Sequence, residues 1–495
     1  MSYKTLLSVI CILLISTGLR IYSLGDRALW ADEKVSALCS NGLIGTQPKD
    51  TSVTVINSGI KNKSFSEIKK ATLIQDSGNG LLYYLFLSHW TDWFGNSDYW
   101  LRFPSFLAGV SFLIIGFLFV RRRFNDYSAL LFLISSSVFS LFIIYSQTAR
   151  SYELALFATF SSTFIFCELI DALENKLNKY KILVYSIAYF LLLCICMFLH
   201  YYTFYIFAGH AIYLILHHFK NSKIIYLFVG IYASFSIFFL YWMLNGGLEG
   251  YSLMSGRNAW WVQQAKDSGT YFNLAFFAKS FITFFVAMTG VYMSYIKGFQ
   301  VYLLLPFIGA LILIALLYFK STSTSTSTSN RILNLFIYTI IVQLAFAISM
   351  ALKNGHVLSL SPYYNIFTIP YIFILLAYIS NEIVKKRKFR LAVILFYSIF
   401  VIYNLVFLYF YYTKKNIHHS AENNPYVEAA SLIEKQISIG DTVVSRQWID
   451  GKLISLYTNK SFLFLYNPYL EKDEIYINKK GNDKLTILNL EGKRY

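Results

Sequence analysis

The stretch Arg20–Lys34, with the sequence RIYSLGDRALWADEK, directly follows the first long apolar segment of the chain, residues 6–19. This position predicts that the stretch lies where a first membrane helix leaves the bilayer. Asp32 and Glu33 place two adjacent carboxylates beside that exit, where charged groups are costly unless they serve a function. We interpret the pair as functional groups. The alternative is that Asp32 caps the N-terminus of a following helix.

The composition of the 495-residue chain is that of a membrane protein. Hydrophobic residues make up 56% of the sequence, charged residues only 14%, and the mean hydropathy is +0.50. Ordinary soluble domains are less apolar than this. The net charge of +17 comes mostly from basic residues in short loops between apolar segments. That placement is typical of cytoplasmic loops and does not indicate a nucleic-acid partner.

Apolar segments close to the ~20 residues that cross a bilayer recur along residues 1–412 and predict about 11–13 transmembrane helices. The distribution of basic residues predicts a cytoplasmic N-terminus, with the loop 25–97 and the C-terminus outside. A segment at 274–293 would invert every later loop if it crossed. We therefore interpret it as interfacial or re-entrant, or as part of an extra pair of passes. The other expected spans lie near 6–19, 100–120, 129–146, 224–243, 301–319, 332–351, 363–380 and 391–412, with three more between 153 and 220.

Three further stretches have a distinct character. Gly80–Trp90 is apolar but short, and it predicts a helix lying in the membrane interface. Residues 321–329 form a Ser/Thr repeat typical of a flexible linker. After residue 413 the pattern changes: 427–435 has helical periodicity, whereas 441–445 and 461–465 are typical of strands. We expect a small extracytoplasmic α/β domain at 413–495.

Known cofactor motifs are absent from the sequence. No Walker loop or glycine-rich dinucleotide loop occurs, which argues against ATP-driven transport. Four of the five cysteines fall inside expected spans, so Cys39 alone lies in an outer loop and has no outer partner for a disulfide. No zinc-type spacing of cysteines is present.

Five polar clusters are expected at the outer face: Asp32/Glu33, Asp76 with Asn79, Arg102, 150–153 and 200–202. Each has a simple alternative, such as a snorkelling anchor, an aromatic belt or an interface histidine. Together they supply carboxylates for base chemistry and guanidinium groups for an anionic leaving group. This combination suits group transfer from a phosphate-linked donor.

Several sequence blocks follow one another in a characteristic order: LWADE (29–33), GNGLLYYL (78–85), FG (94–95), LRFPSFLAG (101–109), SQTARSY (146–152), LHYY (199–202), EAA (428–430) and GDTVV (440–444). Taken in this order, the blocks resemble the bacterial branch of the GT-C membrane glycosyltransferases. This branch includes relatives of the protein O-mannosyltransferases and of the aminoarabinose transferase that modifies lipid A. The likeness covers most of the chain.

The resemblance implies a GT-C fold and inverting transfer of one sugar from a polyprenyl-phosphate donor to a hydroxyl of a lipid, glycan or protein acceptor. The expected location is the outer face of the bacterial cytoplasmic membrane. The resemblance assigns Asp32 as catalytic base, Glu33 as a supporting or cation-binding group, and Arg150 to the donor phosphate. No cofactor is implied with certainty, although a divalent metal fits the chemistry. The other residues expected to bind substrate are Tyr152, Arg102, His200, Tyr201, Asn79 and Tyr84.

One departure from the family pattern affects the donor site. Many relatives have an Arg-Tyr pair ahead of a late proline, whereas this chain has Tyr363 and Tyr364 ahead of Pro370. Arg150 or Arg102 would then carry more of the phosphate binding. The competing functions are a polytopic lipid or polysaccharide carrier and an O-antigen-type polymerase or ligase. A carrier should place polar residues at the membrane midplane, and here they gather at the outer ends of the spans.

Overall fold

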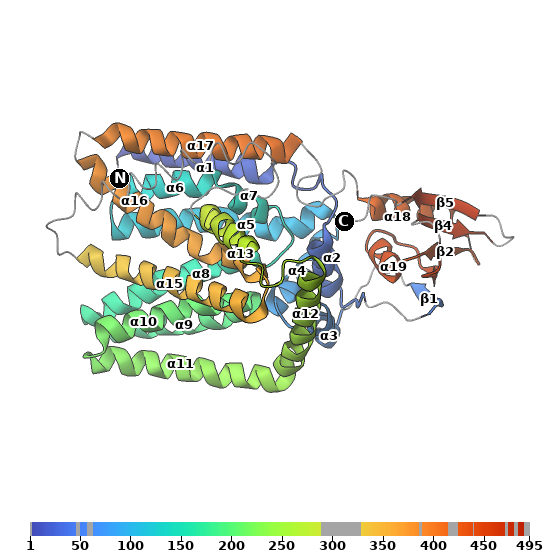
Figure 1. The fold of residues 1–495 in the computed structure, drawn as a ribbon, viewed down its shortest axis with the longest axis horizontal. Helices are drawn as coiled ribbons and strands as arrows, with labels where there is room; N and C mark the ends of the chain where they lie inside the picture. The colour runs from blue at the N-terminus through green and yellow to red at the C-terminus, as the bar shows by residue number, and fades with distance from the viewer. Residues whose placement is uncertain are drawn as a thin grey trace.

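The computed structural model describes residues 2–45, 50–56, 63–288, 328–385, 389–413, 424–438, 440–470, 474–479 and 484–489. It shows a multi-pass membrane protein: a bundle of long helices with a small sheet at one end (Figure 1). Eight described helices are long and apolar enough to span a membrane, or nine if one bent pair is counted. The spans include α1 (Tyr3–Ile21), α5 (Asp98–Arg123), α8 (Tyr152–Glu174), α9 (Lys179–Leu199), α11 (Ser222–Trp242), α15 (Thr328–Asn354), α16 (Ile369–Lys385) and α17 (Arg390–Thr413); the bent pair is α6 (Asp126–Val138) and α7 (Ser140–Ser146).

The helices follow the predicted apolar segments. The sixth predicted span corresponds to α10 (Phe204–His218), which has only 15 residues. The described part of the segment predicted at 274–293 forms α13 (Leu274–Met288), which also has 15 residues. Its interpretation as interfacial, re-entrant or part of an extra pair of passes stays a prediction. The span expected at 301–319 and most of the linker 321–329 lie outside the described residues. The predicted total of about 11–13 spans therefore stays a prediction.

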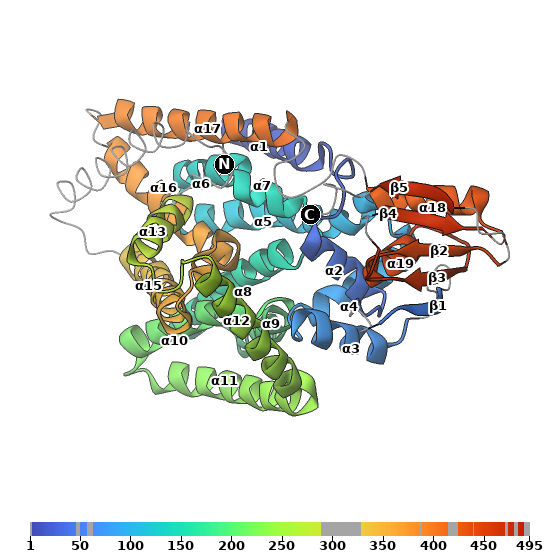
Figure 2. The same cartoon turned by 45° about the vertical axis from the view of Figure 1, so that its right-hand side comes forward.

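Four helices lie at the end of the bundle that faces the sheet. They are α2 (Ala31–Ser40), α3 (Phe65–Asp76), α4 (Leu81–Phe94) and α12 (Leu248–Asp267) (Figures 1 and 2). The N-cap of α2 is Trp30, so Asp32 lies inside the first turn and not at the cap. After the seventh span, residues 248–267 form α12, a helix that runs across the ends of the spans (Figure 1).

The third span is broken rather than straight. Helices α6 and α7 meet at 60°, which leaves backbone groups without helical partners inside the membrane. Arg20 of α1 donates from Nη2 to the carbonyl of Ser136 (3.1 Å) and from Nη1 to that of Ser137 (3.0 Å). On the other side, Asn404 accepts the N–H of Ser140 at 3.0 Å. Because lipid offers no partners, these side chains allow the break to exist.

The small sheet has five strands in the order β1-β3-β2-β4-β5. Strands β2 and β3 are parallel, and the other three pairings are antiparallel. The predicted helix and two strands of this region are confirmed as α18, β2 and β3. Strand β1 was not predicted, because it comes from the first outer loop and not from the C-terminal region. The elements are β1 (Ser52–Ile56), α18 (Pro425–Gln436), β2 (Thr442–Ser445), α19 (Trp448–Ser455), β3 (Phe462–Tyr466), β4 (Glu474–Asn478) and β5 (Lys484–Asn489).

The sheet and the first outer loop share one core. Leu38 of α2 and Ile56 of β1 pack into the same apolar cluster as Ile433 and Phe464 of the C-terminal region. The division at residue 412/413 stays a prediction; α17 ends at Thr413, and residues 414–423 are not described. Within the described residues, the C-terminal α/β unit is completed by parts of the loop 25–97.

Candidate active site

The carboxylate of Glu33 is fully engaged by the surrounding structure. Arg102 of α5 donates to it from Nε and from Nη2, each at 2.8 Å, and both side chains are almost completely buried. The backbone N–H of Ala149 adds a 2.7 Å bond to Oε1, and that of Trp30 adds a 3.2 Å bond to Oε2. Each oxygen of this buried carboxylate thus accepts two hydrogen bonds. Glu33 therefore ties three segments together.

Arg102 also organises the loop that carries Glu33. Its Nη1 donates to the carbonyls of Leu24 (3.0 Å) and Arg27 (2.8 Å), and its Nη2 donates to that of Ala28 (3.1 Å). The stretch after the first span is thus wrapped around one guanidinium group. This arrangement fixes the start of α2, and with it the position of Asp32.

Arg150 forms a second buried cluster on the turn between α7 and α8. Its Nη2 lies 3.1 Å from Oδ2 of Asp76, and its Nη1 donates to the hydroxyl of Tyr84 at 2.6 Å. The Tyr84 hydroxyl in turn donates to Asp76. Burial lowers the pKa of Arg150, but Asp76, Tyr84 and Asp32 outweigh it and hold this pKa well above its usual value. Arg150 is therefore a permanent cation.

Asp32 lies within electrostatic reach of Arg150. It is half-buried in the first turn of α2, one residue before the buried Glu33. Its negative charge helps to raise the pKa of Arg150. This effect is smaller than those of Asp76 and Tyr84. The two neighbouring carboxylates therefore occupy different environments, one locked by Arg102 and one beside the Arg150 cluster.

His200 is a buried, neutral hydrogen-bond donor. Burial, with a smaller contribution from Arg150, lowers its pKa to about 3. The backbone N–H of Tyr202 donates to Nδ1 at 3.2 Å, so Nδ1 accepts and the single ring proton resides on Nε2. Nε2 is buried and has no hydrogen-bond partner among the described residues. Nε of Arg150 is likewise buried and has no hydrogen-bond partner among the described residues.

Aromatic rings form one wall of this region. Tyr152 lies 5.2 Å from His200 and 6.0 Å from Tyr363, measured between ring centroids. Tyr364 stacks on Tyr202 at 4.8 Å. The tyrosine pair that departs from the family pattern therefore lines the same region as His200.

The structure brings most of the predicted site residues together. Asp32, Asp76, Tyr84, Arg150, Tyr152 and His200 form one connected group. Arg102 and Glu33 lie behind it as supports. Asn79 and Tyr201 join the neighbouring turns, because the Asn79 side chain accepts the Tyr201 N–H at 3.0 Å.

Sequence reasoning missed the amide of Ala149, which binds Glu33 through its backbone and so leaves no signal in the residue type. In the part of the chain that the structure describes, no three His, Cys, Asp or Glu side chains converge in a way that could hold a metal ion.

No protein-family model and no curated protein sequence matches the chain. Solved structures are nevertheless similar in fold. ArnT from Cupriavidus metallidurans, bound to undecaprenyl phosphate, aligns with a TM-score of 0.54 at 11% identity, covering 91% of this chain and 84% of that one. An Archaeoglobus fulgidus oligosaccharyltransferase, in complex with Zn and sulfate, aligns with a TM-score of 0.50 at 14% identity, covering 88% and 56%.

A third solved structure is the archaeal oligosaccharyltransferase AglB in complex with an inhibitory peptide and a dolichol-phosphate. It has a TM-score of 0.49 and 14% identity, and 58% of its length is covered. The chain thus spans little more than half the length of the oligosaccharyltransferases. Identities this low show the fold alone. The predicted fold class, a GT-C-like helical membrane protein with a small sheet, is confirmed at that level.

Proposed function

We propose that the protein is an inverting glycosyltransferase that moves one sugar from a polyprenyl-phosphate donor to an acceptor hydroxyl at the outer face of the bacterial cytoplasmic membrane. One observation carries the proposal: within the described residues, buried N–H groups of Arg150 and His200 have no hydrogen-bond partner, and the half-buried carboxylate of Asp32 lies within electrostatic reach of Arg150. Unpaired buried donors are costly. An oxygen-rich anionic ligand would satisfy both. The similarity in fold to ArnT agrees with such a ligand.

In this mechanism Asp32 is the general base. It takes the proton of the acceptor hydroxyl while the acceptor oxygen bonds to the anomeric carbon of the sugar, typically a gain of ~10²–10⁴ in rate. The bond from that carbon to the phosphate oxygen breaks on the opposite face. Both electrons leave with the polyprenyl phosphate, and the configuration at the carbon inverts.

Arg150 stabilises the departing phosphate. Its charge is permanent, and its orientation is fixed by Asp76 and Tyr84, so little reorganisation is needed as negative charge develops. The neutral His200 is suited to donate a hydrogen bond to a sugar or phosphate oxygen. The rings of Tyr152 and Tyr363 offer an apolar face to the sugar.

Glu33 has a supporting role in this proposal. Both of its oxygens already accept hydrogen bonds from Arg102 and from backbone amides. Its function is to hold α2 against α5 and against the turn that carries Arg150.

The alternative of a carrier draws little support from the polar groups inside the bundle. Arg20 is occupied by the break in the third span. His210 of α10 is hydrogen-bonded on both ring nitrogens, to Thr163 at 3.0 Å and to Tyr189 at 2.9 Å. These groups join helices to one another. They are not left open to a passing substrate.

The proposal is tested with purified protein and a radiolabelled polyprenyl-phosphate sugar. Transfer to an added hydroxyl acceptor is expected from the parent, and Asp32→Asn should reduce turnover by about two orders of magnitude or more. Asp26→Asn, an exposed carboxylate six residues away in the same loop, is the matched control and should retain activity. Binding without turnover in the parent would favour a carrier. Normal turnover in Asp32→Asn would refute the base assignment.

A further inference from the structure

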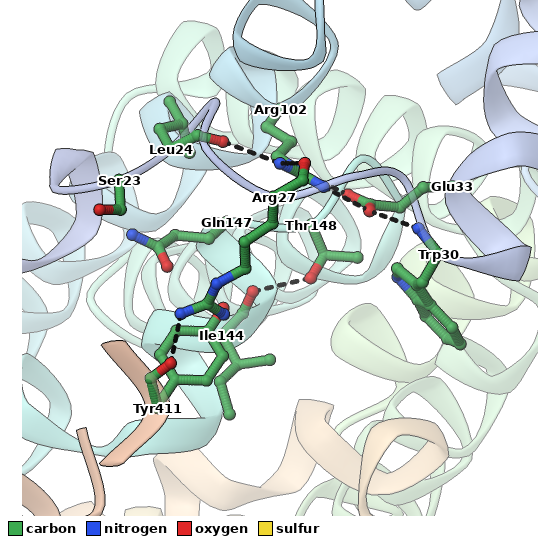
Figure 3. A pocket seen from close by; sticks show the side chains of 10 residues that line it. All are labelled: Ser23, Leu24, Arg27, Trp30, Glu33, Arg102, Ile144, Gln147, Thr148 and Tyr411. Carbon is green, nitrogen blue, oxygen red and sulfur yellow. Dashed lines mark hydrogen bonds and ion pairs between the residues drawn. The ribbon is translucent and has the colours of Figure 1, made fainter. Parts of the chain in front are cut away.

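A second polar cleft lies apart from the Arg150 cluster, where the chain leaves α1 beside the end of α17 (Figure 3). The space that it encloses is small, about 20 Å³, enough for one water-sized group such as a single phosphate oxygen. Arg27 and Trp30 come from the stretch after α1, Gln147 and Thr148 from the turn after α7, and Tyr411 from α17. The Glu33–Arg102 pair borders the cleft on the side toward the proposed active site.

Arg27 is held in this cleft from both ends. Its guanidinium carbon lies 3.6 Å from the centre of the Tyr411 ring, and its Nη2 donates to the Tyr411 carbonyl at 2.5 Å. Its own carbonyl accepts from Arg102. The remaining terminal nitrogen, Nη1, is shielded from solvent and makes no hydrogen bond within the described part of the chain. The side chain is therefore preorganised, with one donor still unused.

The electrostatics of the cleft favour an anion. The negative charge of Glu33 is balanced by its bidentate pair with Arg102, which leaves the charge of Arg27 uncompensated within the lining. A guanidinium fork matches the spacing of phosphate oxygens and is less strongly hydrated than an ammonium group. A phosphate oxygen is thus the acceptor that Nη1 fits best.

The surroundings point to a lipid as the source of that phosphate. The cleft lies where α1 and α17 end together: Tyr22 and Tyr412 meet edge to face at 5.0 Å, and Tyr22 and Tyr409 are exposed. Exposed tyrosines at the ends of spans mark the headgroup level of a bilayer. The cleft therefore opens at the depth of lipid phosphates.

We propose that this cleft is a binding site for the phosphate of an anionic membrane lipid, held by the unused Nη1–H of Arg27. The site is distinct from the Arg150 cluster, because neither Arg150 nor Asp76 lines the cleft. Thr148 lines the cleft, whereas Arg150, two residues later, contacts Asp76. The proposal does not depend on the transferase reaction, since it concerns binding alone.

The test measures thermal stabilisation of the full-length protein in detergent by short-chain phosphatidic acid, with phosphatidylcholine and inorganic phosphate as comparisons. Phosphatidic acid should raise the melting temperature of the parent saturably, and phosphatidylcholine much less. Arg27→Gln should weaken the apparent affinity about 10- to 100-fold, the loss expected for a hydrogen bond to a charged group. Arg27→Lys, which keeps the charge but not the fork, should fall in between.

Two controls make the result specific. Arg257→Gln removes a surface arginine of α12 that contacts only the carbonyl of Ile74 among the described partners, and it should leave the shift unchanged. Because a lipid phosphate also binds at Arg150 under the proposed function, Arg27→Gln is measured again in an Arg150→Ala background, where it should cause the same loss of affinity. The lipid-free melting temperature of each variant shows whether it folds.

Three results would overturn the proposal. They are an absent shift in the parent, equal shifts with phosphatidic acid and phosphatidylcholine, or a shift that survives in a folded Arg27→Gln. Loss of the shift in Arg150→Ala alone would assign the lipid to the other cluster. A shift with inorganic phosphate equal to that with lipid would keep the anion site but reject the lipid as its source.

Discussion

Replacing Glu33 by glutamine should destabilise the first outer loop far more than the same change at its neighbour Asp32. In Glu33→Gln, one oxygen becomes an NH₂ group. Each oxygen of Glu33 accepts one N–H of Arg102 and one backbone N–H, from Ala149 or from Trp30. In either orientation of the glutamine amide, its NH₂ group would point at one N–H of Arg102 and one backbone N–H, and these groups cannot accept a hydrogen bond.

The magnitude follows from leaving Arg102 buried without its counter-charge. Removal of one partner of a buried ion pair costs about 3–5 kcal/mol. At about 1.4 kcal/mol for each factor of ten, the population in which the loop has released should rise by roughly two to four powers of ten. Asp32 is half-buried and outside this pair, so Asp32→Asn should change that population little.

Hydrogen exchange measured by mass spectrometry on purified protein reads this release directly. The informative peptides contain Ala149, whose amide donates to Glu33, and the stretch 24–33. In Glu33→Gln, both peptides should exchange much faster than in the parent protein. In Asp32→Asn, their exchange rates should stay close to those of the parent. Equal exchange in the two variants would refute the division of roles between the neighbouring carboxylates. Unchanged exchange in Glu33→Gln would mean that the pair does not hold the loop.

Three further predictions concern the donor site, acid stability and orientation. Arg150→Lys should weaken donor binding about tenfold and Arg150→Ala far more, at similar protein yield; full affinity in the lysine variant would exclude a bidentate phosphate contact. Because the pKa of His200 falls to about 3 on folding, from an ordinary value of 6.5, the unfolded state binds more protons between these values. Stability should therefore drop as the pH falls below about 6.5, by at most about 1.4 kcal/mol per pH unit from this group, and melting curves of His200→Gln should show less of this loss; identical pH profiles would contradict it. In a cysteine-free background, an impermeant thiol reagent applied to intact cells should label Asn478→Cys but not Lys176→Cys, and the reverse pattern would invert the predicted topology.

The sequence predicted the spans well because membrane crossing depends on the length of apolar segments, a local property. It also predicted that Asp32, Arg150 and His200 lie at one end of the bundle, since alternating basic loops indicate which turns share a face. The break in the third span was not predictable. No proline or glycine marks it, and it depends on Arg20 and Asn404 from distant helices.

The separate roles of Asp32 and Glu33 could not be read from the sequence either. Which of two adjacent carboxylates turns inward is decided by Arg102, which lies 69 residues after Glu33 in the chain. The added strand β1 escaped detection for a related reason. Its apolar pattern is short, and its partner in the sheet belongs to the opposite end of the chain.

Strand β1 has a consequence for the order in which the protein can be made. It is synthesised about 400 residues before β3, its partner in the sheet, a delay of roughly 20–80 s at 5–20 residues per second. Until then Leu38 of α2 has no core to enter, and Lys34 cannot reach the Tyr426 ring that lies 5.4 Å from it. The helix that carries Asp32 is thus braced on its far side only once α18 and β3 have been synthesised. Under the proposed function, a nascent chain would not hold its catalytic base in place before that stage.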